Sequence, residues 1–177
     1  VLTIVDGLTS KTIEEYHFAD GQVLTIEELR DRFLQGTDGD DQLIGFDDRG
    51  DVLAGGSGSD ALEGGTGDDT YRYGYGDGDD SIFETGGIDR LEFGTNITRY
   101  DVSFADVDGD LVIGLKDTGE TLVVLSGLLT SDQNTQIETF AFEDGDTLAL
   151  AEIRAQIFED RSNSCLLYTS PSPRDRY

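Results

Sequence analysis

The sequence predicts an all-β protein, in which a coil of stacked nine-residue units is followed by a small antiparallel β cap with short helices. Large apolar residues recur at intervals of 10, 9, 9 and 11 residues from Leu43 to Ile82. Glycines and then an acidic residue precede each of them. Beyond this stretch, apolar segments of strand length alternate with turn sequences such as Asp108-Gly109. These three observations favour short strands over long helices.

Residues 1–35 contain short alternating apolar segments, which are typical of strands, followed by a helix. Thr25 and Glu28 have the spacing of a capping box, in which each side chain accepts the backbone N–H of the other residue. We expect this helix to end near Gln35. One of its faces carries the apolar residues Ile26, Leu29 and Phe33.

The same segment recurs 124 residues further along the chain. Ile13 to Gly21 matches Ile137 to Gly145, and a second helical pattern follows the second copy. We therefore predict that residues 1–35 are the end of a preceding repeat period and that the sequence belongs to a tandem array. Ala149 stands where Thr25 caps the first helix, so the start of the second helix should be less stable by about 1 kcal/mol.

Residues 36–83 are predicted to form the stacked coil. Each unit opens with glycines, because a tight turn repeatedly needs backbone conformations with positive φ. A nine-residue unit cannot bury its one apolar side chain alone, so the units must stack. A flexible Gly/Asp-rich linker is the alternative. A linker gives no reason for an apolar residue at every ninth position.

Stacking brings acidic side chains together. The segment from Asp38 to Asp80 contains 12 aspartates, and only Arg49 and Arg72 oppose them. Carboxylates held this close repel one another unless a cation lies between them. Calcium is the hard divalent cation that best tolerates flexible loops of oxygen ligands. The pattern therefore predicts a calcium-binding coil.

This stretch resembles the RTX, or haemolysin-type, calcium-binding repeats, whose nonapeptide pattern is G-G-x-G-x-D-x-U-x. Gly55–Glu63 and Gly64–Arg72 match every fixed position, and Gly36–Ile44 lacks only the second glycine. In the second unit, Phe46 to Arg49 stand where glycines are expected. The resemblance implies a parallel β-roll over residues 36–83, with odd-numbered units turning on one side and even-numbered units on the other.

The resemblance also implies that Ca²⁺ lies between neighbouring turns of one side, bound by aspartate carboxylates and backbone carbonyls. The sixth position of each unit would supply the side-chain ligand, and the glycines would offer carbonyls. We expect two or three ions, with the second unit departing most from the pattern. The candidate metal-binding residues are Gly36, Asp38, Gly39, Asp41, Asp51, Gly56, Gly58, Asp60, Gly65, Gly67, Asp69, Gly76, Gly78 and Asp80.

Residues 84–160 are predicted to be a β-rich capping domain with a short helix, and to resemble the haemolysin-type calcium-binding-related domain that often flanks RTX repeats. Such a domain would cover the open end of the roll. Residues 161–177 resemble translated sequencing-adaptor sequence, and we exclude them from the predicted fold. The antiparallel strands expected within residues 84–160 are Arg90–Phe93, Val102–Ala105, Leu111–Leu115, Thr121–Leu125 and Ile137–Phe142, with a hairpin turn at Asp108-Gly109.

Composition limits the function. The net charge of −26 excludes nucleic acid as a partner, because phosphate contacts need a basic surface. It also argues against an anionic membrane surface, and no apolar run is long enough for direct membrane insertion. The single histidine, His17, and the single cysteine, Cys165, supply no zinc or cysteine catalytic constellation. We therefore expect this chain not to be an enzyme.

We expect a secreted, extracellular bacterial protein of toxin, haemolysin-like or adhesin-like type, whose partners are calcium ions and neighbouring repeats of the same chain. The resemblance implies type I secretion. Extracellular modules bind calcium at about 0.1 to 1 mM, so calcium would drive folding outside the cell. The alternative function is the non-catalytic C-terminal part of a secreted RTX enzyme, such as a protease or a lipase.

Overall fold

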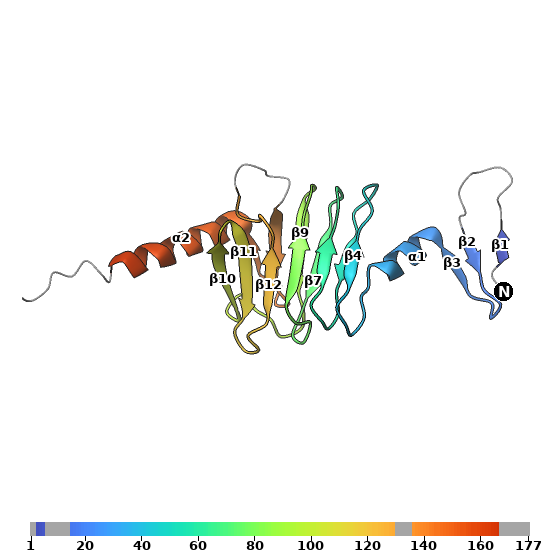
Figure 1. Cartoon of the computed structure of the whole chain (residues 1–177), viewed down its shortest axis with the longest axis horizontal. Coiled ribbons are helices and arrows are strands. Elements are labelled where there is room, and N and C mark those ends of the chain that lie inside the picture. Colours follow the sequence, from blue (N-terminus) through green and yellow to red (C-terminus); the bar gives the residue numbers. More distant parts are fainter. Residues whose placement is uncertain (1–2, 6–14, 130–135, 167–177) are drawn as a thin grey trace, which may run out of the picture.

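The computed structural model describes residues 3–5, 15–129 and 136–166. Figure 1 shows a small N-terminal sheet, helix α1, a stack of strands and helix α2 following one another along the long axis of the molecule. No helix in these ranges is long and apolar enough to cross a membrane. The elements are β1 (Thr3–Val5), β2 (Glu15–His17), β3 (Val23–Thr25), α1 (Ile26–Phe33), β4 (Gln42–Ile44), β5 (Val52–Ala54), β6 (Ala61–Glu63), β7 (Thr70–Tyr73), β8 (Asp80–Phe83), β9 (Asp89–Phe93), β10 (Val102–Val107), β11 (Asp110–Leu115), β12 (Thr121–Val124), β13 (Ile137–Ala141), β14 (Thr147–Ala149) and α2 (Leu150–Leu166).

Helix α1 begins with the predicted capping box. The Thr25 hydroxyl accepts the N–H of Glu28 at 3.2 Å, and the Glu28 carboxylate accepts the N–H of Thr25 at 2.8 Å. The predicted apolar face of the helix is not covered, because no residue of α1 is buried and Phe33 is 66% exposed. The helix lies between β3 and β4, connecting two parts of the molecule, and the next residue, Leu34, enters the core instead (Figure 1).

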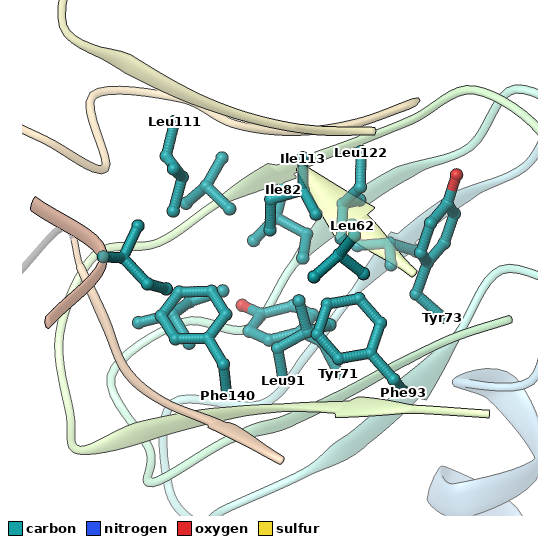
Figure 2. Packing of buried hydrophobic residues seen from close by; sticks show 14 of the residues in the cluster. Leu62, Tyr71, Tyr73, Ile82, Leu91, Phe93, Leu111, Ile113, Leu122 and Phe140 are labelled. Carbon is teal, nitrogen blue, oxygen red and sulfur yellow. The ribbon is translucent and has the colours of Figure 1, made fainter. Parts of the chain in front are cut away.

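The strands after α1 alternate between two sheets. One sheet contains β4, β6 and β8 in parallel, and the other contains β5, β7 and β9 in parallel. The repeated apolar residues face the interior between the sheets, as the spacing predicts, and every one of them is at most 7% exposed. They are Leu43, Leu53, Leu62, Tyr71 and Ile82, and Leu91 of β9 continues the series. Figure 2 shows Leu62, Tyr71, Ile82 and Leu91 in this interior.

The C-terminal strands extend the same two sheets, so the expected antiparallel β cap is found only in part. Strand β12 pairs in parallel with β8, and β13 pairs in parallel with β9. Only β10, β11 and β14 add antiparallel pairs at the far edges. Strand β9 itself is parallel to β7, because Leu91 keeps the nine-residue spacing from Ile82. The result is two mixed sheets with two helices, and no strand pairing among the described residues closes them into one roll.

The C-terminal part of the chain contains the predicted hairpin turn and helix α2. Asp108 and Gly109 have φ values of 56° and 98°, the left-handed conformations that a two-residue hairpin turn needs, so the predicted turn between β10 and β11 is confirmed. Helix α2 buries Leu150, Ile153 and Ile157. It continues to Leu166, past residue 161. The rest of the adaptor-like tail, residues 167–177, and the first two residues of the N-terminal repeat match, Ile13 and Glu14, lie outside the described residues.

Candidate metal centre

The turns between successive strands of one sheet lie directly on one another. Glycine makes this approach feasible, because a Cβ atom at Gly67 would overlap the carbonyl oxygen of Arg49, and one at Gly78 would overlap that of Gly58. Gly78 also has a φ of 99°, which side chains with a Cβ rarely adopt. The turns therefore form two columns, one for each sheet, in which the sixth residues of the units are also stacked.

The first column contains a row of aspartates from the odd-numbered units. Asp60 Oδ1 accepts the backbone N–H of Asp41 at 2.8 Å, and Asp80 Oδ1 accepts that of Asp60 at 2.9 Å. Asp60 and Asp80 are 2% and 4% exposed. We call Asp41, Asp60 and Asp80 the Asp41 row. One oxygen of Asp60 and one of Asp80 thus join each turn to the preceding one.

The second column contains an equivalent row from the even-numbered units. The backbone N–H groups of Asp51, Asp69 and Asp89 each donate to the next carboxylate of the row, at 2.7, 2.8 and 2.7 Å. The last acceptor is Glu138 of β13. All three aspartates are at most 2% exposed. We call Asp51, Asp69, Asp89 and Glu138 the Asp51 row.

The second carboxylate oxygens divide the aspartates into two groups. Asp41 and Asp51 use the second oxygen to accept the N–H of Thr37 or Phe46 in their own turn, at 2.6 and 2.5 Å. In Asp60, Asp69 and Asp89 the Oδ2 atom is buried and has no hydrogen-bond partner in the part of the chain that the structure describes. A buried carboxylate oxygen without a partner is costly, and it is a ready ligand for a hard cation.

Three of these acids converge in one place. Ligand atoms of Asp69, Glu84 and Asp89 all lie within 4.8 Å of one another, and all three side chains are buried. Glu84 is fixed there, since Thr85 and Gly86 donate their N–H groups to Oε1 at 2.7 and 3.2 Å. Its other oxygen accepts the hydroxyl of the core residue Tyr71. The residues of this cluster fit a divalent cation with oxygen ligands.

The electrostatics of the rows favour a bound cation or proton. Burial, followed by the negative charges of Glu84 and Asp69, raises the pKa of Asp89 to about 7. Burial is also the main reason that the pKa of Asp80 is raised to about 6 and that the pKa values of Asp69 and Glu84 are raised. Each of these carboxylates is therefore less stable as an anion here than in water.

The structure places the predicted ligand residues unevenly. Asp60, Asp69 and Asp80 are brought into the buried rows, and Asp51 is buried beside Arg49. Asp38 is exposed, in the first turn of its column, and the candidate glycines Gly36, Gly39, Gly56, Gly58, Gly65, Gly67, Gly76 and Gly78 line the turns. The assignment of these residues as calcium ligands stays a prediction.

Sequence analysis missed three acids of this site. Asp89 has a signal, because Leu91 follows it by two residues and follows Ile82 by nine, so residues 84–92 form a sixth unit. Glu84 stands where this unit should begin with glycine, which hid the repeat. Glu138 lies in a strand with no sequence pattern that points to the aspartates, and only the parallel pairing of β13 with β9 brings it there.

The comparisons with known proteins address the C-terminal part of the chain. Residues 110–152 match the haemolysin-type calcium binding protein related domain. This range contains β11 to β14 and the start of α2, so it includes Glu138 of the Asp51 row. No curated protein matches the chain. The match covers less than half of the chain and does not include the nonapeptide units.

Proposed function

We propose that this chain is a calcium-binding module of a secreted protein, a parallel β-roll that folds when Ca²⁺ binds between its turns after export. The observation that carries the proposal is the buried cluster of Asp69, Glu84 and Asp89, in which two Oδ2 atoms have no hydrogen-bond partner among the described residues. The domain match at residues 110–152 supports the same metal, because that family is named for calcium binding.

The residues of the cluster have separate tasks. Asp69 and Asp89 each use Oδ1 to accept the N–H of the preceding aspartate, which leaves Oδ2 to bind the ion. Tyr71 donates its hydroxyl to Glu84 and holds that carboxylate toward the other two. Bound calcium supplies the positive charge that offsets the repulsion among the three carboxylates. In the other column, Asp60 offers the equivalent free oxygen.

Calcium suits this site better than magnesium does. Ca²⁺ accepts six to eight oxygen ligands in flexible geometry, whereas Mg²⁺ demands a near-ideal octahedron and gives up its water molecules reluctantly. A set of carboxylates on stacked turns matches the first case. Binding at about 0.1 to 1 mM, as in extracellular modules, would leave the acidic chain unfolded at cytosolic calcium levels and fold it outside the cell. We propose a binding role with no catalysis of its own.

A calcium titration tests the proposal. Purified protein in chelator is titrated with CaCl₂ while far-ultraviolet circular dichroism records strand content, and isothermal calorimetry counts the ions bound. We expect strand signal to rise with calcium and not with an equal concentration of MgCl₂. Asp69→Asn should lose at least one bound ion, whereas Asp117→Asn, which removes an exposed acid outside both rows, should lose none. Complete strand signal in chelator together with no heat of calcium binding would overturn the proposal.

A further inference from the structure

The turn of the second unit is built differently from the other turns of its column. Arg49, Gly67 and Gly87 hold the same place in three successive turns of this column. A Cβ at Gly67 would overlap the carbonyl oxygen of Arg49, and a Cβ at Gly87 would overlap the carbonyl oxygen of Gly67. Arg49 is in the first turn of this column, so its own side chain meets no earlier turn. A large residue is therefore tolerated at this position alone among the three.

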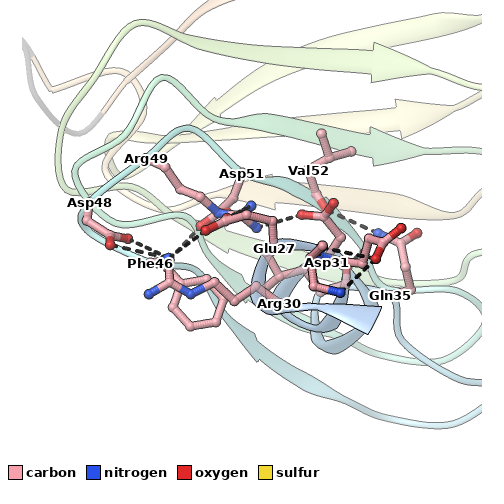
Figure 3. Close-up of polar contacts among 12 residues, drawn as sticks. Glu27, Arg30, Asp31, Gln35, Phe46, Asp48, Arg49, Asp51 and Val52 are labelled. Carbon is pink, nitrogen blue, oxygen red and sulfur yellow. Dashed lines mark hydrogen bonds and ion pairs between the residues drawn. The ribbon is translucent and has the colours of Figure 1, made fainter. Parts of the chain in front are cut away.

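The Arg49 side chain reaches both the Asp51 row and helix α1 (Figure 3). Its Nε lies 2.6 Å from Asp51 Oδ1, and the two atoms form an ion pair. Neither atom has a hydrogen-bond partner among the described residues, so each depends on this ion pair. Its Nη1 and Nη2 donate to Glu27 and Asp31 of α1 at 2.8 and 2.7 Å. The Asp51 side chain is fully buried, whereas Arg49 remains 21% exposed.

A second set of contacts fixes the same helix to the same turn. The guanidinium of Arg30 lies 4.7 Å from the centre of the Phe46 ring and 3.2 Å from a carboxylate oxygen of Asp48. The Arg49 guanidinium lies 5.6 Å from the same ring. Such contacts between a cation and an aromatic ring are worth about 0.5 to 1 kcal/mol at exposed sites. Thus three of the four residues that stand where glycines are expected in this unit contact helix α1. They are Phe46, Asp48 and Arg49.

Backbone pairing also attaches the end of α1 to the stack of strands, through residues 34–36 and β5. We call these contacts, together with those of Arg49 and Arg30, the joint. Gly36 donates its N–H to the carbonyl of Ala54 at 2.8 Å, and Ala54 donates to the carbonyl of Leu34 at 3.0 Å. The Gln35 amide donates to the carbonyl of Val52 at 3.1 Å. These bonds cover the free edge of β5, which would otherwise expose unpaired backbone groups.

We infer that the Arg49 guanidinium takes the place of a metal ion at Asp51, so that the first turn of this column binds helix α1 instead of calcium. The inference rests on the proposed function, since it names the turn that lacks the ion. Both oxygens of Asp51 are in use, one by Arg49 and one by the N–H of Phe46. Asp69, one turn further, keeps one oxygen free. A divalent cation beside a fixed guanidinium would also meet like-charge repulsion.

The first test counts ions. Calorimetric titration with CaCl₂ should give the same number of bound ions for the wild-type protein and for Asp51→Asn, whereas Asp69→Asn should lose at least one. Loss of an ion from Asp51→Asn would overturn the inference, because Asp51 would then be a calcium ligand. If the wild-type protein binds no calcium, the proposed function fails, and the second test still decides whether Arg49 holds the joint.

The second test measures the joint at saturating CaCl₂ by hydrogen exchange of residues 26–36 and 54. Arg49→Gln should speed exchange there at least tenfold, and the double variant Arg49→Gln/Asp51→Asn should recover part of that protection, because no buried carboxylate is left unpaired. Arg72→Gln removes an equally charged residue from an exposed ion pair and should change nothing. Should Arg49→Gln fail to fold, Asp31→Asn reports the same contact from the helix side. Unchanged exchange in both variants would overturn the inference.

Discussion

The two ends of the Asp51 row are finished in opposite ways. At the N-terminal end, Asp51 is neutralised within the chain by Arg49, and the turn is attached to helix α1. At the C-terminal end, Asp89 meets two more acids, Glu84 and Glu138, and no arginine or lysine forms an ion pair with it in the described part of the chain. One end carries its own cation, and the other gathers negative charge.

This difference shows how the two ends of one column of repeated turns can be adapted to different surroundings. At the N-terminal end, the Arg49 guanidinium joins the turn to helix α1 without a bound ion. The C-terminal end keeps carboxylate oxygens free, and its stability then depends on what neutralises them. Substitutions in the stacked turns and at the acidic end separate these two behaviours.

The largest effect should come from Gly67→Ala. Its Cβ would overlap the carbonyl oxygen of Arg49, which is backbone and cannot move aside without separating two turns of the column. Gly39 occupies the equivalent level in the first turn of the other column and has nothing within 4 Å of a Cβ position. We expect Gly67→Ala to lower the free energy of unfolding by about 3 kcal/mol or more, measured by urea denaturation in saturating calcium.

Gly39→Ala is the matched control for that change. It should be neutral or stabilising by up to about 1 kcal/mol, because it restricts the unfolded chain without a clash in the folded one. Equal losses from both variants would contradict the comparison between an end turn and an interior turn.

Sequence reasoning succeeded where a rule is local. The period of the apolar residues gave the strands and the buried face, and Thr25 and Glu28 gave the cap of α1. It failed where partners are distant in the sequence. The pairing of β12 with β8 and of β13 with β9 joins segments more than 40 residues apart, and nothing in either strand specifies its neighbour.

The candidate site was predictable to a similar extent. The aspartates of the units were identified from their spacing. Their spacing does not show that both oxygens of Asp51 are used, by Arg49 and Phe46, whereas Asp69 keeps one oxygen free. Glu84 replaces a glycine, and a pattern of glycines cannot show that the replacement points into the site.

The next effect in size should come from Glu84→Gln, which removes a charge from the acidic end and keeps the shape. Calcium affinity should fall at least tenfold, about 1.4 kcal/mol, because one anionic ligand is lost. The protein in chelator should become more stable, because Asp69 and Asp89 lose a negative neighbour. Calorimetry measures the calcium affinity, and the strand signal that remains in chelator measures the stability of the calcium-free protein.

A fall in calcium affinity together with a rise in stability in chelator would identify Glu84 as a ligand and not as a purely structural residue. Glu63→Gln, which removes an acid from a strand outside both rows, should leave calcium affinity unchanged. If affinity and chelator stability of Glu84→Gln fall together, Glu84 contributes to packing and not to ion binding.

Acid should have a distinctive effect on the protein in chelator. The folded pKa values of Asp89, about 7, and Asp80, about 6, lie above the ordinary value of 3.8, so the folded state binds protons more tightly than the unfolded chain. This contribution to stability is fully present below pH 3.8 and is lost as pH rises through 6 to 7, at roughly 1.4 kcal/mol for each pKa unit. Circular dichroism in chelator should therefore show more strand content at pH 5 than at pH 7.5, and the reverse order would contradict the raised pKa values.

The smallest effect concerns the helices at the two ends of the stack. Thr25 caps α1 with both halves of a capping box, whereas Ala149 of α2 keeps only one half, in which its N–H donates to Glu152 at 2.8 Å. Ala149→Thr adds a hydroxyl that can accept the N–H of Glu152, and it should raise the free energy of unfolding by about 1 kcal/mol. For a chain of this length that corresponds to a rise of about 2 to 4 °C in Tm, measured by calorimetry in saturating calcium. Ala151→Thr places the same side chain inside the first turn of α2, where it should cost a few tenths of a kcal/mol. A gain no larger than that of Ala151→Thr would mean that the capping difference between the two helices has no energetic consequence.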